Sequence, residues 1–434
     1  MDDRHRRSRL RLLNFTTMHR RNHPWAALGV CLCVFASAQF RGVQAAEKGA
    51  PFTVEDLVML KRITDPQVSP DGRYLAFVQR ETDLAGNRGR TSLWLMALAA
   101  GAHPLQLTDA GGGDSSPRWA SDSRTLYFLS ARSGSQQVWR IVLSGAEARR
   151  VTDFPLEVGT LKVSPTGHSL AVSMEVFPDC PTLPCTRERL DARLKNKATG
   201  RTYERLFVRH WDRWADGTRS HLFTVAADTA LPTAAAVDVM RGLDADVPGK
   251  PFGADEDFAF SADGRSLVFS ARVAGREESW STNFDLYQVP VEGNAAPVNL
   301  TASNPACDAQ PVFLANGDLA WIAQQRPGFE SDRFHIMVRR AQSGAVSTLT
   351  GSWDRSVARL GATPDGRWLL AAVDELGQRS TASIRAAECR RDSLRPAKWN
   401  RSARARTAWH SRVPIWAGRP TCTCSRCVAE RPGA

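Results

Sequence analysis

Long apolar segments are scarce in this sequence of 434 residues. The most apolar segment, residues 25–38, is 14 residues long, which is too short to cross ~30 Å of hydrocarbon comfortably as a helix. A membrane anchor is therefore disfavoured. Cysteine is also scarce: residues 46–379 contain only Cys180, Cys185 and Cys307, which leaves few options for disulfides.

A basic surface is lacking in most of the chain, although the formal net charge is +12. Residues 1–24 account for +5 and residues 380–434 for +9, so the part between them carries −2. A phosphate-binding surface would need clustered Lys and Arg in the folded body. The charge distribution therefore argues against a nucleic-acid partner.

The first 45 residues have the layout of a secretory signal peptide. Arg20 and Arg21 precede the apolar segment, and Val43-Gln44-Ala45 forms a small-residue exit. We expect cleavage after Ala45, a periplasmic or secreted protein, and no stable membrane anchor afterwards. In that oxidising setting Cys180 and Cys185 could close a small disulfide loop, the alternative being two unpaired thiols.

A short motif recurs along the chain and indicates a repeat architecture. It begins as Ser-Pro-Asp-Gly-Arg at residues 69–73 and returns in degenerate form with its second turn residue at Gly72, Ser123, Gly167, Gly264, Gly317 and Gly366. Each copy reads as a strand, a two-residue turn that needs positive φ, and a second apolar strand. The intervals are 51, 44, 97, 53 and 49 residues, so we expect one further, hidden unit between Gly167 and Gly264.

Two more strands complete each unit. A third strand with a large apolar residue follows most hairpins, and HLFTVAA from His221 is assigned to the hidden unit. A fourth element ends in Leu-Thr or Val-Thr, at Thr108, Thr152, Thr301 and Thr350. Four antiparallel strands in about 50 residues leave no room for the helices of solenoid repeats. The sequence therefore predicts an all-β fold, a β-propeller of about seven blades over residues 46–379.

An insertion interrupts the propeller at about residues 176–205. Residues 186–205 carry ten charges and are expected to form a short helix or exposed arm. The next segment crowds four candidate substrate-gating residues into five positions: His210, Trp211, Asp212 and Trp214. They could form a binding lip. The simpler interpretation, which the sequence favours, is that both Trp side chains pack against blades while Asp216-Gly217 makes a hairpin turn.

The last 55 residues differ from the rest. Residues 380–434 contain eleven Arg and ten Ala but only one Leu, two Ile, two Val and no Phe. The combined share of Leu, Ile, Val and Phe is thus below the ~20% level under which disorder is expected. We expect a disordered basic tail that begins in mid-blade after Arg379, and our hypothesis is that it is an out-of-frame reading of a GC-rich gene. Three of its four cysteines, Cys422, Cys424 and Cys427, with distant His410, are a poor match to a zinc site, so neither a metal nor a cofactor is expected.

The repeat units, the leader, residues 52–77 and especially residues 203–223 (YERLFVRHWDRWADGTRSHLF) resemble the N-terminal propeller of exported prolyl oligopeptidase family serine peptidases, in the dipeptidyl or acylaminoacyl peptidase branch. The resemblance implies a propeller that caps a C-terminal α/β-hydrolase domain and admits short peptides. That domain would carry a Gly-x-Ser-x-Gly nucleophile elbow. None occurs in this sequence, so no catalytic residue is assigned and we expect the chain to be inactive alone.

Two points remain open beside this resemblance. Glu277-Glu278 is similar to the acidic pair that holds a substrate amino terminus in some dipeptidyl peptidases, but its neighbours differ and a solvated loop is expected. Ser-Pro-Asp-Gly-Arg units also occur in TolB-like propellers. The alternative function is therefore a freestanding periplasmic propeller that binds protein partners.

Overall fold

The structure, a computed structural model, describes residues 51–145, 147–211, 213–227 and 236–386. The predicted signal peptide and residues 387–434 of the predicted tail lie outside the described residues. The helices and strands of the described residues belong to the second of two compact units, Val54–Ala434. Within the described ranges, no helix combines the length and the apolar character needed to cross a membrane.

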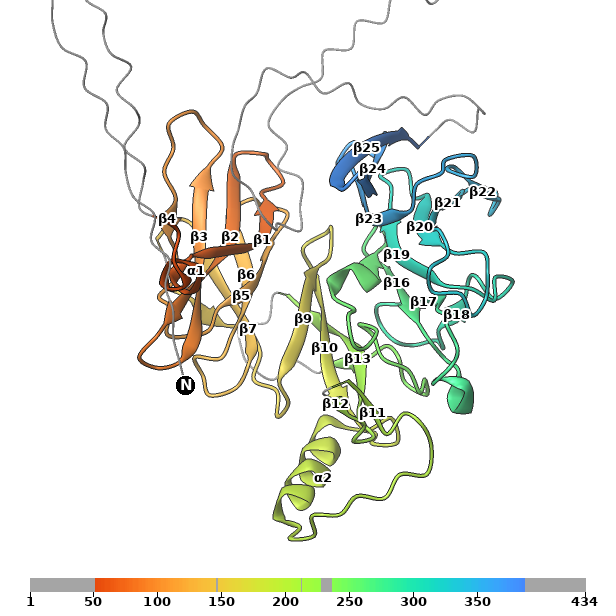
Figure 1. Cartoon of the computed structure of the whole chain (residues 1–434), viewed down its shortest axis with the longest axis horizontal. Coiled ribbons are helices and arrows are strands. Elements are labelled where there is room, and N and C mark those ends of the chain that lie inside the picture. Colours follow the sequence, from red (N-terminus) through yellow and green to blue (C-terminus); the bar gives the residue numbers. More distant parts are fainter. Residues whose placement is uncertain (1–50, 146, 212, 228–235, 387–434) are drawn as a thin grey trace, which may run out of the picture. The chain divides into compact units, whose positions relative to one another are not determined.

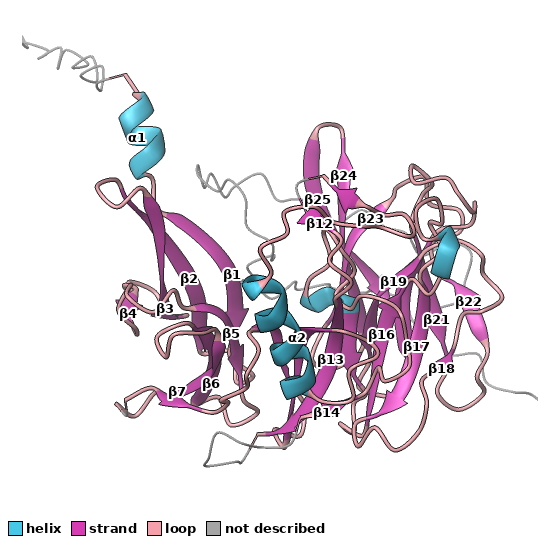
Figure 2. Cartoon of the chain, turned by 90° about the horizontal axis from the view of Figure 1, so that it is seen from below, coloured by secondary structure: helices cyan, strands magenta, loops and turns pink. Residues whose placement is uncertain are grey.

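The fold is a β-propeller, and its strands far outweigh its helices in the described part (Figure 2). Helix α1 (Val54–Met59) precedes the first blade. Blade 1 contains β1 (Arg62–Val68), β2 (Tyr74–Asp83), β3 (Arg88–Ala97) and β4 (Leu105–Gln106). Blade 2 contains β5 (Ser115–Trp119), β6 (Thr125–Ser130), β7 (Gln137–Val142) and β8 (Arg149–Arg150). Both sheets are antiparallel, and the strands pair in chain order.

Blade 3 is split by the insertion. Its strands are β9 (Val158–Val163), β10 (Ser169–Val176), β13 (Arg219–Ala226) and β14 (Val237–Asp238). Between β10 and β13 lie helix α2 (Leu183–Lys195) and the hairpin of β11 (Arg209–His210) and β12 (Arg213–Trp214). The blade nevertheless keeps its antiparallel order, because β10 pairs with β13 without a register shift along eight residue pairs.

Three further blades follow (Figure 1). Blade 4 comprises the 3-10 helix η1 (Asp255–Asp257), β15 (Phe258–Phe260), β16 (Ser266–Ala271), the 3-10 helix η2 (Gly275–Glu277), β17 (Asp285–Pro290) and β18 (Val298–Asn299). Blade 5 comprises β19 (Asp308–Phe313), β20 (Leu319–Ala323), β21 (His335–Arg339) and β22 (Val346–Thr348). Blade 6 comprises β23 (Val357–Ala362), β24 (Trp368–Glu375) and β25 (Gln378–Arg385).

The described residues confirm the predicted propeller and form six blades, slightly fewer than the predicted number of about seven. The hidden unit is not a blade: His221, assigned to it, lies on β13, which is the third strand of blade 3. The interval of 97 residues arose because the insertion separates β10 from β13. Spacing alone cannot distinguish a long insertion inside one blade from an extra blade.

The end of the propeller also differs from the prediction. The blade does not stop at Arg379, because β25 continues to Arg385 and pairs with β24 along its whole length. The Ala386 backbone then donates a hydrogen bond to the Arg367 carbonyl. Polar Ser and Thr side chains concealed this strand in the sequence, since they lack the apolar pattern of the other third strands.

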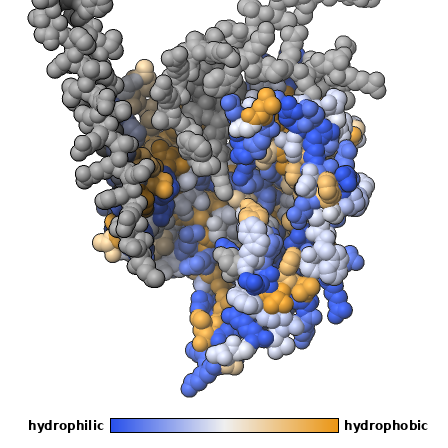
Figure 3. All heavy atoms as spheres, viewed as in Figure 1, coloured by the Kyte–Doolittle hydropathy of each residue, from blue (hydrophilic) through white to orange (hydrophobic). Residues whose placement is uncertain are grey.

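The apolar core is divided among the interfaces between successive blades. Ala76, Val78 and Leu93 of blade 1 cluster with Leu126 and Phe128 of blade 2, and each later interface has its own cluster. Hydrophobic residues on the face shown in Figure 3 accordingly form small, separate patches among hydrophilic ones. Burial of apolar area between blades is thus the main stabilising contribution.

The repeated turns set the register of the hairpins, as predicted. Gly72 has φ +71°, in the left-handed region that glycine adopts at little cost. The Ser69 hydroxyl donates to Asp71 (2.6 Å) and accepts the Tyr74 backbone N–H (2.9 Å). Ser261 with Asp263 and Thr363 with Asp365 repeat the first contact.

Candidate functional site

The insertion presents three of the four predicted gating residues on the short hairpin β11–β12. His210 pairs with Arg213 across the hairpin, and Trp211, directly after β11, has φ +49°. Asp212 lies outside the described residues. The strands of this hairpin end at Trp214, so Asp216-Gly217 is not its turn, contrary to the simpler interpretation.

Both tryptophans are exposed, so the prediction that they pack against blades is wrong. Trp211 is 66% exposed and Trp214 58%. A row of rings runs through the first of them: Phe207 stacks on His210 (5.1 Å), His210 meets Trp211 edge-on (5.9 Å), and Trp211 meets Phe252 (4.9 Å). We call Phe207, His210, Trp211 and Phe252 the aromatic lip.

Trp214 belongs to a second, smaller group. Its ring lies 6.3 Å from that of Tyr203 and 5.7 Å from the Arg209 guanidinium. The structure therefore separates Trp214 from His210 and Trp211, although the three are close in sequence. Successive strand residues point to opposite sides of a hairpin, which accounts for the separation.

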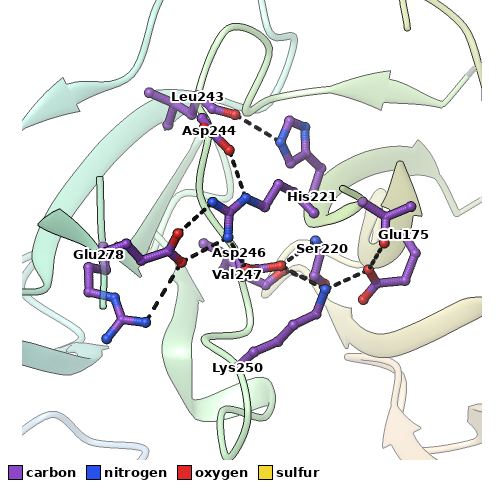
Figure 4. A network of polar contacts seen from close by, with 12 residues as sticks. Glu175, Ser220, His221, Leu243, Asp244, Asp246, Val247, Lys250 and Glu278 are labelled. Carbon is purple, nitrogen blue, oxygen red and sulfur yellow. Dashed lines mark hydrogen bonds and ion pairs between the residues drawn. The ribbon is translucent and has the colours of Figure 1, made fainter. Parts of the chain in front are cut away.

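A network of ion pairs is centred on Arg219 (Figure 4). The Arg219 guanidinium donates to Asp244 (2.7 Å), to Asp246 (2.9 Å) and to both oxygens of Glu278 (2.8 and 2.7 Å). Lys250 adds contacts to Asp246 (2.9 Å) and Glu175 (2.7 Å). Blades 3 and 4 are thereby tied together at the base of the insertion.

Arginine side chains link this network to the aromatic residues. Arg272 lies 3.7 Å from Glu278, and its guanidinium is 5.8 Å from the Phe207 ring and 5.1 Å from the Phe284 ring. Arg205 of the insertion binds Asp244 (2.8 Å). Charged groups of blades 3 and 4 thus support the aromatic lip.

Ion pairing outweighs burial in its effect on the pKa values of Arg219 and Asp244. Burial by itself would lower the pKa of Arg219, but hydrogen bonds to Glu278 and the charge of Asp246 raise it overall. Burial would raise the pKa of Asp244, but hydrogen bonding and charge from Arg219 lower it overall. Arg219 and Asp244 therefore remain ionised at neutral pH, as expected for a hydrogen-bonded ion pair.

The pair Glu277-Glu278 behaves differently from the prediction. Glu277 is exposed on η2, but Glu278 is only 9% exposed and is bound by Arg219. The expectation of a solvated loop is therefore wrong for Glu278. Its two oxygens already accept charged hydrogen bonds, so Glu278 acts as part of the Arg219 network.

A second group of charged residues joins the first strands of the blades. These residues, the inner-strand cluster, are Asp65, Arg118, Lys162, Asp255, Glu256, Asp257 and Arg359. Arg118 binds Asp65 (2.7 Å) and Asp255 (3.1 Å), and Lys162 donates to the carbonyls of Asp255 and Phe258 (both 2.6 Å). Arg359 binds Glu256 (2.6 Å).

Backbone bulges place part of this cluster. The register shifts in β1, β5, β19 and β23. In three of these strands the shift coincides with a residue at positive φ before a proline: Asp65, Ser116 and Gln310. Bulges of this kind redirect side chains. The sequence analysis missed the cluster, although a proline six residues before the second turn residue (Pro66, Pro117, Pro311) would have indicated it.

Within the inner-strand cluster Asp257 differs from its neighbours. Burial raises its pKa to about 6, the charge of Glu256 adds to the effect, and a hydrogen bond from the Gly249 backbone opposes it. Burial would also raise the pKa of Asp255, but the Arg118 charge lowers it overall. Asp257 therefore titrates closer to neutral pH than an ordinary aspartate does.

The structure joins Cys180, which precedes α2, to Cys185 in the first turn of that helix by a disulfide. The Thr182 hydroxyl caps this helix by accepting the Cys185 backbone N–H (3.3 Å). Cys307 is free, and burial raises its pKa to about 12. In the part of the chain that the structure describes, no group of three His, Cys, Asp or Glu side chains is placed to hold a metal.

Comparison with known proteins agrees with the predicted resemblance. The TolB beta propeller domain family matches residues 58–176. Dipeptidyl-peptidase 5 of Porphyromonas endodontalis is 27% identical over 317 residues, which are 72% of this chain and 44% of that protein. The enzyme of the same name from Porphyromonas gingivalis is 26% identical over 345 residues, which are 77% of this chain and 48% of that protein.

Solved structures show the same fold. The acylaminoacyl peptidase of Pyrococcus horikoshii superposes with a TM-score of 0.54 at 12% identity, over 75% of this chain and 45% of that one. The chain is thus similar in sequence to dipeptidyl-peptidases 5 and shares its fold with an acylaminoacyl peptidase. The chain spans about half the length of the curated relatives it matches.

Proposed function

We propose that this chain, whose homologues include dipeptidyl-peptidases 5, is the substrate-gating propeller of an exported serine peptidase of the dipeptidyl or acylaminoacyl type. The aromatic lip carries the proposal. Exposed aromatic rings that are held in place by the Arg219 network suit the binding of apolar peptide side chains. Peptides are accordingly the proposed ligands.

Hydrolysis itself is assigned to an α/β-hydrolase domain outside these 434 residues. The sequence contains no Gly-x-Ser-x-Gly, and that elbow is what exposes the nucleophile in such domains. The surface of α1 supports docking of a further domain: Val54, Leu57 and Met59 are all exposed, and the helix has no buried residue. Large apolar side chains gathered on one exposed helix are typical of an interface.

The first test is hydrolysis by the purified 434-residue chain. We expect no release of fluorophore from dipeptidyl or acylaminoacyl substrates and no labelling by a fluorophosphonate. Activity that a fluorophosphonate abolishes would show that the nucleophile lies within the chain and would refute this assignment.

The gating role is tested by joining residues 46–386 to the hydrolase half of the Porphyromonas endodontalis relative. We expect peptidase activity, and Trp211→Ala should lower kcat/KM for substrates with apolar side chains about tenfold, the equivalent of ~1.4 kcal/mol. The control is Trp280→Ala, since Trp280 is equally exposed at 66% but lies outside the lip. Equal effects of the two variants would contradict a specific role of the lip.

Export is the remaining part of the proposal. The leader at residues 1–45 motivates it, and the Cys180–Cys185 disulfide suits an oxidising compartment. Mass spectrometry of the chain from a cell-envelope fraction should find an N-terminus at Ala46. An intact leader on cytosolic protein would contradict export.

The second candidate is a freestanding propeller that binds proteins, favoured by the match of residues 58–176 to the TolB beta propeller domain. It predicts that the chain joined to a hydrolase half confers no peptidase activity. The same fusion experiment therefore separates the two functions.

A further inference from the structure

In blades 1 to 5, two equivalent hydrogen bonds connect a short outer strand to the third strand. In four blades a threonine hydroxyl accepts the backbone N–H of a fully buried residue: Thr108 from Leu93 (3.0 Å), Thr152 from Val138 (2.9 Å), Thr301 from Leu286 (2.9 Å) and Thr350 from Ile336 (2.8 Å). This contact accounts for the recurring Leu-Thr and Val-Thr pairs of the sequence.

The residue before each threonine supplies the second bond. It donates its backbone N–H to the carbonyl of that same buried residue, at 2.7–2.8 Å: Leu107 to Leu93, Val151 to Val138, Leu300 to Leu286 and Leu349 to Ile336. In blade 3, Val239 and the sulfur of Met240 make the equivalent contacts to Leu222. We call this pair of bonds the outer clasp.

In blade 6 the corresponding position is Thr381. Thr381 pairs with Ala372, which lies six residues after the turn residue Gly366. In blade 1, Leu93 pairs with Val78, which lies six residues after the turn residue Gly72. Among the described residues no outer strand lies beside β25. Thr381 and Ser383 are exposed, and β25 offers an edge of eight residues where the outer strands of the other blades have two or three.

At the clasp spacing, the chain's own sequence matches the outer clasp only in part. In four blades the clasp threonine follows the residue it caps by 14 or 15 positions, which for Thr381 leads to Arg395 and Pro396. Leu394 stands where the backbone donor would be, but neither Arg395 nor Pro396 has a hydroxyl to accept the Thr381 N–H.

We propose that the β25 edge accepts an extended strand from a separate polypeptide, and that the strand it recognises carries an apolar residue followed by threonine. Exposed strand edges bind such segments through backbone hydrogen bonds. The five outer clasps define the chemistry of the partner, because each shows which groups satisfy the third strand at this register. The inference does not depend on the proposed peptidase function.

A second copy of this chain fits the edge less well. Antiparallel self-pairing of β25 centred on Ala382 would set Arg379 opposite Arg385 of the other copy, and like charges at directly opposed positions are destabilising. A short strand with Leu-Thr or Val-Thr avoids this repulsion. The test nevertheless includes dimerisation as an outcome.

The experiment measures fluorescence anisotropy of the labelled peptide Ala-Val-Ser-Thr-Leu-Thr-Gly-Ser, which copies residues 345–352, during titration with the full 434-residue chain. We expect saturable binding. Replacing the second threonine of the peptide by alanine should weaken it roughly two- to tenfold, as for the loss of one hydrogen bond. In the chain, Thr381→Pro should abolish binding because it removes the N–H, whereas Thr381→Val keeps the N–H and should bind as the unmodified chain does.

Hydrogen exchange makes the test independent of how the variants fold. On the unmodified chain the peptide should slow exchange at the amides of Thr381 and Ser383. Absence of binding, or binding unaffected by Thr381→Pro, would overturn the proposal. A dimer in sedimentation that Thr381→Pro dissociates would also overturn it, in favour of self-pairing.

Discussion

Most buried charges in this protein are opposed by a partner within hydrogen-bonding distance. Arg219 binds three carboxylates and Arg118 binds two. Asp257 differs from the partners of these arginines, because its carboxylate accepts a backbone hydrogen bond from Gly249 (2.9 Å) and lies next to Glu256. Burying a poorly compensated carboxylate favours its protonated form.

Asp257 should therefore make stability fall as the pH rises. Its pKa is raised from 3.8 to about 6 in the folded protein, so the folded state binds the proton more tightly and stabilisation is lost between these values. Asp257→Asn should be more stable than the unmodified chain by ~1–3 kcal/mol above pH 6, with the difference vanishing near pH 4. Urea unfolding at pH 4 and pH 8 measures it.

Asp263→Asn is the control for this pH dependence. A hydrogen bond from Ser261 lowers the pKa of Asp263, so the replacement should remove stability at pH 8 instead of adding it. A gain of stability in both variants would contradict the assignment of the effect to burial of Asp257.

At the scale of the elements, the hairpin turns share a conformation but differ in their surroundings. Gly72 and Gly366 both have positive φ, at +71° and +65°. A Cβ at Gly72 would have no atom within 4 Å, whereas a Cβ at Gly366 would lie 2.6 Å from the Ala315 backbone nitrogen. The turn of blade 6 thus touches the turn of blade 5.

The two glycines should respond differently to alanine. Gly72→Ala should cost ~1–2 kcal/mol, because only the left-handed backbone is strained. Gly366→Ala should cost more, because the Ala315 backbone must also move. Thermal unfolding of both variants measures the difference, and equal losses would show that the two turns do not touch in solution.

The insertion is an element with its own anchors. The disulfide and Thr182 fix the start of α2, and Phe177 lies against the guanidinium groups of Arg189 (4.6 Å) and Arg193 (4.4 Å). Arg205 then joins the Arg219 network. These contacts keep the short hairpin β11–β12 of the long insertion in one place beside blade 4.

At the scale of the whole molecule, the blades are joined by apolar clusters and by the inner-strand cluster. The clusters connect neighbours only, as in other repeat architectures. Arg118 of blade 2 reaches further, because it binds Asp65 of blade 1 and Asp255 before blade 4. Its side chain is mostly buried, and its Nε has no hydrogen-bond partner among the described residues.

Arg118→Gln should consequently weaken the propeller as a whole. We expect a loss of about 3 kcal/mol, because two partly buried carboxylates lose their partner. Tryptophan fluorescence and circular dichroism should report the same shift of the unfolding midpoint if the blades unfold together. The control is Arg73→Gln, which breaks an exposed ion pair with Asp71 and should leave the midpoint unchanged.

Much of the fold could be predicted because its rules are local. Turn chemistry at Gly72 and its equivalents, alternating strands, and the Leu-Thr and Val-Thr pairs identify blades without any tertiary information. The same local rules failed for β25, whose Ser and Thr residues do not look like a strand, and for the interval between Gly167 and Gly264, which holds an insertion instead of a blade.

The candidate site was less predictable than the fold. His210, Trp211 and Trp214 were found by composition, but their exposure was not, because it depends on how the hairpin β11–β12 projects from blade 3. Phe252 and Arg272 are distant in sequence from the hairpin, and no local pattern connects them to it. The buried role of Glu278 likewise depends on Arg219 of another blade.

The sequence by itself determined the propeller, its antiparallel hairpins and the place of the insertion, since these follow from contacts between residues near each other in the chain. The tertiary structure alone decided the number of blades, the aromatic lip, the Arg219 network and the open edge at Thr381. Each of these depends on which distant segments meet, and packing between blades settles that through burial, charge pairing and hydrogen bonds that no short stretch of sequence contains.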